Sequence, residues 1–261
     1  MNGITAQFCA EYARHRAREG HGLSGEALRA LPYLRSGPLA RQWAVRARSF
    51  DAFSRMILRP GGRSPLALLD LGAGNGWLCH RAARMGHRPV ALDIRDDDID
   101  GLGAARRLLA ETPGLFECVT ASFDAIPLAS KRFDVTLFNA SLHYAHDLKA
   151  TLAEAIRVTR PGGLLVIMDS PFYARDEDGR AMIAEKKNGG ARQFGAGADL
   201  LLAPEFIEYL TRKRLAGAAP ALIWTRHRVR YPLWYEMRPL FARLKGRRAP
   251  SRFDLWTARL P

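Results

Sequence analysis

An acidic side chain, Asp70, stands just before three glycines at alternate positions, Gly72, Gly74 and Gly76. Glycines at this spacing adopt backbone dihedrals that a Cβ forbids, and they let a ligand approach the main chain closely. A phosphate bound at such a loop would be repelled by the carboxylate, whereas a cationic group would be attracted. The segment therefore predicts a binding site for a ligand that carries positive charge and no phosphate.

The residues on either side of the glycines predict how this loop is positioned. The apolar run 66–71 is typical of a buried parallel strand, and apolar residues recur at helical spacing from Leu78 to Met85. A strand, a glycine turn and a helix in this order place the loop at the carboxyl edge of an open α/β sheet, where such folds bind ligands. S-adenosylmethionine, with its ammonium and sulfonium groups, has the required charge, and we predict that Ala73 contacts it together with the glycines.

A second acid, Asp93, ends the next predicted strand, over residues 88–94. A carboxylate at that strand end, about twenty residues past a glycine loop, accepts hydrogen bonds from the hydroxyls of a ribose. This feature is shared with NAD-binding proteins, so it predicts an adenosine nucleoside without choosing the cofactor. Ile94 is expected to lie against the adenine. The acids from Asp96 to Asp100 are interpreted as helix-capping residues, and no metal is expected.

Several ordered segments between residues 66 and 170 resemble those of a known family. With Asp70 ahead of its glycines, the first segment resembles motif I of the class I S-adenosylmethionine-dependent methyltransferases. Residues 121–128 are similar to a segment of the methyltransferases of ubiquinone and menaquinone biosynthesis. The strand 132–139 and the turn 160–163 match the same pattern. The resemblance implies a Rossmann-like fold, with S-adenosylmethionine as the methyl donor and S-adenosylhomocysteine as the product.

The resemblance also indicates where the adenine lies. In the family, an acid at the position of Ser122 receives the adenine amino group, and Asp124 falls on the family's glutamate. The hydroxyl of Ser122, the backbone N–H of Phe123 and the carboxylate of Asp124 are therefore three alternatives for this contact. Asn139, at the end of the strand 132–139, is expected to be a further cofactor contact.

Residues that follow this strand are expected to face the methyl acceptor. His143 lies where relatives often carry a histidine, and its ordinary pKa near 6.5 suits a general base. The alternative is a histidine that packs the loop or hydrogen-bonds the backbone around the cofactor. Acceptor contacts are further predicted at Leu142, Tyr144, Phe172 and Tyr173.

Residues 1–60 precede the first sheet strand and are predicted to form a helical cap. Three helices are expected, at residues 5–18, 24–33 and 38–59, the last of them ended by Pro60-Gly61-Gly62. By the family resemblance, such a cap closes over the cofactor and the substrate. Arg46 and Arg48 are the candidates for pairing with the methionyl carboxylate, and the alternative for each is a solvated helix face.

Residues 61–261 are predicted to form the methyltransferase-type domain. Its fold class is α/β, a Rossmann-like doubly wound sheet of about seven strands, mostly parallel with the last strand antiparallel. The core lies at 66–170, with substrate-lid insertions at 171–220 and 232–250. The finer expectations are a helix at 180–187, glycine hinges at 189–190 and 195–197, a helix at 204–212, a strand at 221–231, helical turns at 234–244 and a strand at 252–260.

The chain is strongly basic, with 40 Lys and Arg against 26 Asp and Glu and a net charge of +14. This charge favours anionic partners such as nucleic acid or acidic lipid, but no nucleic-acid-binding motif accompanies it. Three scattered cysteines fit neither a disulfide framework nor a metal site, and no apolar run is long enough to span a bilayer. With no signal-peptide core at the N-terminus, a cytoplasmic location is expected. Nothing predicts the oligomeric state.

These features predict an enzyme that moves a methyl group to an oxygen or nitrogen atom, rather than carbon or sulfur, of a small-molecule metabolite. The reaction is an in-line displacement, for which positioning and desolvation supply most of the rate. The first alternative is methylation of RNA or protein through the basic surface. The others are an NAD-dependent oxidoreductase and a non-catalytic protein that retains the cofactor pocket.

Overall fold

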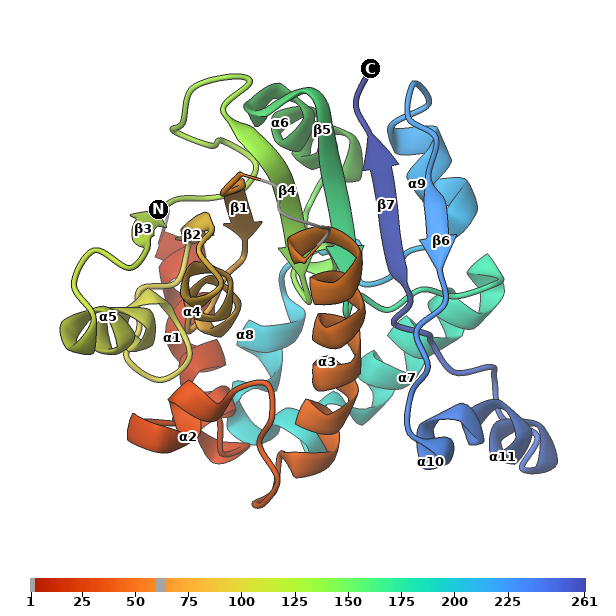
Figure 1. Ribbon diagram of the computed structural model, residues 1–261. Helices are drawn as coiled ribbons and strands as arrows, with labels where there is room; N and C mark the ends of the chain where they lie inside the picture. Colours follow the sequence, from red (N-terminus) through yellow and green to blue (C-terminus); the bar gives the residue numbers. More distant parts are fainter. Residues whose placement is uncertain (1–2, 60–63) are drawn as a thin grey trace.

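A seven-stranded sheet runs through the molecule, in the strand order β3-β2-β1-β4-β5-β7-β6 (Figure 1). The computed structural model describes residues 3–59 and 64–261. Strands β1 to β5 pair in parallel, and β7 is antiparallel to both of its neighbours, β5 and β6. This confirms the predicted fold class. The strands are β1 Ala67–Leu71, β2 Arg88–Asp93, β3 Glu117–Thr120, β4 Phe133–Asn139, β5 Thr159–Met168, β6 Thr225–His227 and β7 Leu255–Arg259.

Helices cover both faces of the sheet, because successive residues of each central strand point to opposite sides. In β1, Leu68 packs into one hydrophobic core and Leu69 into the other, and both are fully buried. The first core is completed by α3, α4 and α5 and the second by α6 and α9. These helices are α3 Ala40–Phe53, α4 Trp77–Arg84, α5 Leu102–Glu111, α6 Leu148–Val158 and α9 Arg212–Ala218.

The strand order reverses direction at β1, which has β2 on one side and β4 on the other. In doubly wound sheets a crevice opens at such a point, beyond the carboxyl ends of the strands. The glycine segment after β1 lies there. None of the described helices has the length and apolar content needed to cross a membrane.

Further helices gather at the carboxyl edge of the sheet (Figure 1). Two of the three helices predicted before the sheet are α1 and α2, and the third is α3 with a π-helical turn, η1 Ser54–Leu58. The predicted stop at Pro60-Gly61-Gly62 lies outside the described residues. Helix α1 packs against α8, and it also approaches the preceding turn, η3, so closely that a Cβ on Gly197 would collide with Glu11. The additional bounds are α1 Gly3–Arg18, α2 Gly25–Ala30, α7 Asp176–Phe194, η3 Gly195–Gly197 and α8 Ala198–Leu202.

The predicted glycine hinge at 189–190 is wrong. Helix α7 runs unbroken through Gly189 and Gly190, so the short helix expected at 180–187 is part of a 19-residue helix. A Cβ on Gly190 would meet the side chain of Leu202, whereas one on Gly189 would meet nothing within 4 Å. Gly190 therefore allows close packing of α7 against α8, and tertiary packing overrides its weak helix propensity.

The helix predicted at 204–212 is also absent. Residues 204–211 form an irregular loop in which Glu208 has a φ of +62°, and α9 begins at Arg212. Several amides of the loop bond to distant carbonyls, with Ile207 N–H donating to Ala145 O at 2.8 Å and Leu210 N–H to Pro171 O at 2.9 Å. Because these partners lie far away in the sequence, local spacing does not reveal them. The turn expected at 160–163 instead belongs to β5, which bulges where it pairs with β4.

The predicted strands near the C-terminus are shorter than expected, with β6 covering only three residues of 221–231. The helical turns predicted between them are present as α10 Leu233–Glu236 and α11 Arg238–Leu244. The last strand, β7, is antiparallel to β5, as predicted.

Candidate active site

A cavity of about 700 Å³ lies at the carboxyl edge of the sheet, beyond β1, β2, β4 and β5. Its volume is in the range of small-molecule sites. Helices α1 and α3 and the segment after α8 form the rest of its wall. Of the residues predicted from the sequence, it brings together Arg46, Gly72, Ala73, Gly74, Asp93, Ile94, Ser122, Phe123, Asp124, Asn139, His143 and Tyr144.

The glycine loop forms the floor of the cavity. Gly72 and Gly74 have φ of +77° and +54°, a region that disfavours residues with a Cβ. The N–H of Gly74 donates to Asp93 Oδ2 at 2.8 Å, which ties the loop to the end of β2. Gly76 lies off the wall, and a Cβ there would come within 2.8 Å of the Ala105 methyl carbon. Gly76 therefore allows α4 and α5 to pack, and the predicted cofactor contact is not found there.

Asp93 lies on the cavity wall and is nearly buried. Besides the bond from Gly74, its Oδ1 accepts the N–H of Arg95 at 2.8 Å. Burial raises the pKa of Asp93, and the nearby Arg95 guanidinium opposes this rise. A carboxylate has about four lone-pair sites, so both oxygens keep the capacity to accept a hydroxyl.

Asp70 is not on the cavity wall, which corrects the expectation that its charge faces the ligand. It is fully buried beneath the loop, where its Oδ2 lies 3.8 Å from the Cys79 thiol. Burial raises the pKa of Asp70 to about 8, and the charge of Asp93 adds to this rise. Asp70 is therefore mostly protonated at pH 7, and the selection of a cation by this carboxylate is not supported.

This position predicts a pH-dependent stability. The folded chain holds the Asp70 proton up to a pKa of about 8, whereas an unfolded chain releases it near 4. The protonated form of Asp70 therefore stabilises the folded chain at low pH, and this contribution is lost as the pH rises from about 4 to about 8. Between pH 5 and pH 8 the free energy of unfolding should fall by ~2–4 kcal/mol more in the wild type than in Asp70→Asn. Urea unfolding at a series of pH values measures this difference, and parallel profiles would contradict it.

The part of the cavity wall that follows β3 contains all three residues predicted as alternatives for the adenine contact, Ser122, Phe123 and Asp124. The N–H of Asp124 donates to Ser122 Oγ at 3.2 Å, and its carboxylate accepts the hydroxyl of Thr151 from α6. The Phe123 ring packs edge-on against Phe138 at 6.0 Å. The side chains of Ser122 and Asp124 are thus held by hydrogen bonds, and the Phe123 ring gives this wall an apolar part.

Arg46 and Arg48, the two candidates for the methionyl carboxylate, lie on different sides of α3. Arg46 lies on the cavity wall with its guanidinium 4.9 Å from the ring centroid of Trp43. Burial lowers the pKa of Arg46, and no carboxylate of the described residues lies within ion-pairing distance of it. Arg48 is exposed and points away from the cavity, so its predicted cofactor contact is not found.

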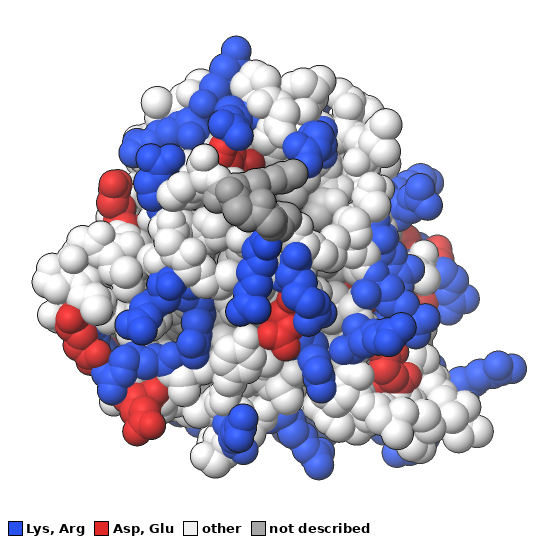
Figure 2. Space-filling model, in the orientation of Figure 1, with Lys and Arg blue, Asp and Glu red and all other residues white. Residues whose placement is uncertain are grey.

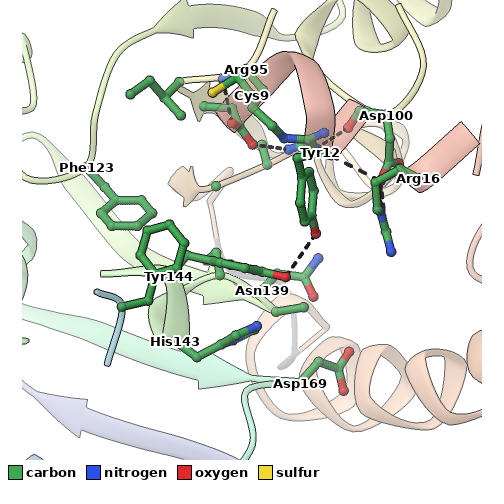
Figure 3. Close-up of a pocket in the computed structure, with 18 of the residues that line it drawn as sticks. Cys9, Tyr12, Arg16, Arg95, Asp100, Phe123, Asn139, His143, Tyr144 and Asp169 are labelled. Carbon is green, nitrogen blue, oxygen red and sulfur yellow. Dashed lines mark hydrogen bonds and ion pairs between the residues drawn. The ribbon is translucent and has the colours of Figure 1, made fainter. Parts of the chain in front are cut away.

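The lid formed by α1 was not predicted in residue detail (Figure 3). Tyr12 reaches from α1 across the cavity, and its hydroxyl lies 2.9 Å from that of Tyr144. Arg16 donates to Asp100 Oδ2 at 2.9 Å, and the Arg95 guanidinium lies 4.9 Å from the Tyr12 ring centroid. These contacts join residues about 80 to 130 positions apart, for which the sequence carries no local signal.

The prediction that the acids between Asp96 and Asp100 cap the next helix is wrong for α5. The N-cap of α5 is Gly101, which makes no side-chain cap bond. Asp97 instead accepts the N–H groups of Ile99 and Asp100 within the preceding turn. Asp100 is directed to the cavity and to Arg16. Within 3–59 and 64–261, no three His, Cys, Asp or Glu side chains form a cluster suited to a metal ion.

Three of the four residues predicted to contact the methyl acceptor lie away from the cavity wall. Leu142 is fully buried in the second core, Phe172 stacks on Trp256 at 4.8 Å, and Tyr173 hydrogen-bonds to Arg248. None of these three lines the cavity, because their side chains fill the fold beneath and beside it. Tyr144 does line it.

His143 also lies on the wall, tilted against the Tyr144 ring at 4.3 Å. Its Nδ1 is 3.5 Å from the hydroxyl of Ser170. Burial lowers the pKa of His143 to about 3, and the charges of Lys186 and Arg46 add to this effect. The imidazole is neutral at pH 7 and is a weak base.

Asp169, which was not predicted as a site residue, lies at the end of β5 on the cavity wall. It is only 6% exposed and has a φ of +54°, which is uncommon for a residue with a side chain. Its Oδ1 accepts the Ser49 hydroxyl at 2.5 Å, and its buried Oδ2 has no hydrogen-bond partner among the described residues. Burial raises the pKa of Asp169 to about 6, although Arg46 opposes this. An acid at the end of a central strand was the available sequence signal.

Comparison with known proteins agrees with this arrangement. Residues 69–167 match the family model described as a methyltransferase domain. A malonyl-[acyl-carrier protein] O-methyltransferase from Yersinia pestis is 26% identical over 55% of this chain and 54% of its own. A demethylmenaquinone methyltransferase from Thermobifida fusca is 35% identical over 39% of this chain and 42% of its own. The chain thus spans about half the length of the curated relatives it matches.

A solved structure extends the likeness over nearly the whole fold. It is geranyl diphosphate C-methyltransferase from Streptomyces coelicolor, in complex with Mg²⁺, geranyl diphosphate and S-adenosylhomocysteine. The two share 16% identity, with 97% of this chain and 98% of that chain covered and a TM-score of 0.62. At 16% identity, this likeness shows that the two proteins share a fold. Residues 69–167 thus match a methyltransferase domain, and the chain shares its fold with a methyltransferase crystallised with S-adenosylhomocysteine.

Proposed function

We propose that this protein transfers a methyl group from S-adenosylmethionine to an oxygen or nitrogen atom of a small organic acceptor. The observation that carries the proposal is the glycine loop tied to Asp93 at the strand-order reversal, on the wall of a cavity of small-molecule size. The match of residues 69–167 to a methyltransferase domain supports the same reaction class.

The residues present fit S-adenosylmethionine in three places. Asp93 retains acceptor capacity for the ribose, and the wall at 122–124 offers an adenine both an aromatic ring and hydrogen-bonding groups. At the end of β4, the side-chain oxygen of Asn139 is buried and without a partner among the described residues, which suits the methionyl ammonium. The unpaired guanidinium of Arg46 suits the methionyl carboxylate. When bound, the cofactor supplies a methyl group activated by a positively charged sulfur.

Asp169 is the candidate to accept the proton that the acceptor loses. Asp169 lines the cavity, its buried Oδ2 has no partner among the described residues, and Ser49 holds Oδ1 in place. A carboxylate with a pKa of about 6 is ionised at neutral pH and still basic enough to accept a proton from a hydroxyl or an ammonium. His143 remains neutral and is better suited to hydrogen-bonding and packing against the acceptor.

The size and lining of the cavity favour a small acceptor over RNA or protein. Its volume is about 700 Å³, and the aromatic rings of Phe8, Tyr12 and Phe206 line it on the side of α1 and the segment after α8. The feature that favours a macromolecular substrate is the basic charge of the chain. The relatives' names refer to a quinone precursor, a malonyl thioester carrier and an isoprenoid diphosphate, which supports a metabolite but does not choose among them.

An NAD-dependent oxidoreductase is disfavoured by the loop itself. Its glycines stand at alternate positions, Gly72, Gly74 and Gly76, and this spacing differs from the dinucleotide fingerprint.

The role of Asp93 gives a direct prediction. Asp93→Ala should weaken S-adenosylhomocysteine binding by ~1–3 kcal/mol, about 5- to 150-fold, because the ribose loses its acceptor and the Gly74 loop loses its anchor. Calorimetric titration measures the loss. The matched control is Asp134→Ala, since Asp134 accepts the N–H of Ala67 at 2.7 Å at the opposite edge of the sheet. Equal affinities of Asp93→Ala and the wild type would remove Asp93 from the site.

Turnover tests the reaction. Purified protein and S-adenosylmethionine are incubated with a panel of acceptors: a hydroquinone, a primary amine, a malonyl thioester and an isoprenoid diphosphate. Mass spectrometry detects a product gaining one methyl group together with stoichiometric S-adenosylhomocysteine. Methylation of a hydroxyl or amine is expected. Tight binding of S-adenosylhomocysteine without turnover of any acceptor class, or methylation of RNA by an enzyme that ignores all of them, would contradict the proposal.

A further inference from the structure

Helices α10 and α11 expose a group of large apolar side chains near the C-terminus. Leu240, Phe241 and Leu244 of α11 are 49%, 51% and 74% exposed, and Leu233 and Trp234 of α10 are 77% and 44% exposed. Single exposed apolar residues are ordinary, but a contiguous group of this size marks an interaction site. We call residues 233–248 the α10–α11 surface.

Positive charge is concentrated in and beside this surface. Residues 226–248 contain eight Lys and Arg and a single acid, Glu236, in a chain whose whole net charge is +14. In Figure 2 the corner that α10 and α11 occupy in Figure 1 is largely white, with Lys and Arg side chains around it. The cations are Arg226, Arg228, Arg230, Arg238, Arg243, Lys245, Arg247 and Arg248.

A separate hollow of about 400 Å³ lies beside α10 and is lined by Arg226, Arg228 and Arg252. Asp254 and Glu236 pair with these arginines from below, but Arg228 remains 73% exposed at its side chain. Guanidinium groups converging at a surface bind phosphate oxygens well, because their planar donors match them in pairs. The hollow is thus suited to an anionic headgroup.

We propose that the α10–α11 surface docks on an anionic phospholipid bilayer. The exposed Leu and Phe side chains would enter the acyl boundary, Trp234 would lie at the interface, and the surrounding arginines would contact lipid phosphates. A second copy of the chain would bring like charges together, and a nucleic acid has no use for exposed leucines. The inference does not depend on the methyl-transfer proposal, although α10 and α11 lie at the same edge of the sheet as the cavity (Figure 1).

Trp234 provides a reporter for the test, because the other four tryptophans are 8% exposed or less. Full-length protein is mixed with vesicles of phosphatidylcholine and phosphatidylglycerol, or of phosphatidylcholine alone, at physiological ionic strength. Sedimentation measures binding, and lipids brominated along the acyl chain measure insertion by quenching fluorescence. We expect binding to the anionic vesicles, with quenching that Trp234→Phe removes.

A triple variant separates insertion from general electrostatic attraction. Leu240→Gln, Phe241→Gln and Leu244→Gln together keep helix formers at exposed positions and should lower partitioning onto anionic vesicles by about tenfold or more. The matched control is Ile223→Gln, which removes an 85%-exposed apolar side chain outside the α10–α11 surface and should leave partitioning unchanged. Circular dichroism and thermal melting confirm that both variants fold.

Three outcomes would overturn the proposal. The first is equal binding to neutral and anionic vesicles, or none to either. The second is vesicle binding that the triple variant leaves unchanged, which would reflect net charge alone. The third is a dimer in sedimentation velocity that the triple variant dissociates, without insertion of Trp234, which would assign the surface to a second copy of the chain.

Discussion

Asp169→Asn is expected to lower the turnover number by ~10²–10⁴-fold, the usual contribution of a positioned proton acceptor. Asparagine keeps the shape of the side chain and the bond from Ser49, but it cannot take a proton. Affinity for S-adenosylhomocysteine should fall far less than turnover, because the proposal assigns Asp169 to the acceptor and Arg46 to the carboxylate of the cofactor. Turnover with an acceptor from the panel and calorimetric titration measure the two quantities.

The pH profile gives this prediction a second readout. Only ionised Asp169 accepts a proton, and burial raises the pKa of Asp169 to about 6. Turnover of the wild type should therefore rise with pH through about 6 and level off above it, and Asp169→Asn should lack this rise. A variant that retains full turnover, or that retains the rise near pH 6, would exclude Asp169 as the proton acceptor.

Arg46→Gln is expected to weaken S-adenosylhomocysteine binding by ~2–5 kcal/mol, at least about 30-fold. The reason is that the variant leaves the amino-acid carboxylate of the ligand in the cavity without its cationic partner. The same variant should bind methylthioadenosine as tightly as the wild type, because that nucleoside lacks the amino-acid group. The matched control is Arg48→Gln, which lies two residues away on the exposed side of α3 and should change neither affinity.

Comparison of the two ligands separates Arg46 from Asp93. Asp93→Ala should weaken the binding of both, since both carry the ribose, whereas Arg46→Gln should weaken only the one that has a carboxylate. Equal losses for both ligands in Arg46→Gln would mean that the cavity had deformed. An effect of Arg48→Gln equal to that of Arg46→Gln would contradict the placement of Arg46 on the wall.

The sheet and its carboxyl edge could be predicted from the sequence because their signals are local. An apolar run followed by glycines predicts β1 and its loop, and an acid at the end of the next strand predicts Asp93. Both Gly74 and Asp93 lie within twenty residues of each other and are in fact hydrogen-bonded. The helix α6, with Asp147 as its N-cap, follows from the same kind of local pattern.

Residue roles that depend on which way a side chain points could not be predicted in the same way. Asp70 and Gly76 have the right spacing, but the first points under the loop and the second into the packing of α5. Arg46 and Arg48 are chemically alike, and the helical rotation of α3 alone separates them.

Contacts made over long distances in the sequence were missed altogether. Tyr12 and Tyr144 are 132 residues apart, and Ser49 and Asp169 are 120 apart. The irregular loop 204–211 and the long helix α7 are set by tertiary partners that override local propensity. The lid and the candidate proton acceptor therefore emerged only with the fold.

The most direct measurement is calorimetric titration of the wild-type protein with S-adenosylhomocysteine and, separately, with NAD. We expect saturable binding of S-adenosylhomocysteine at one site per chain, weakened in Asp93→Ala, and no heat from NAD. Binding of NAD in place of S-adenosylhomocysteine, or binding of neither, would contradict the assignment of this cavity to methyl transfer.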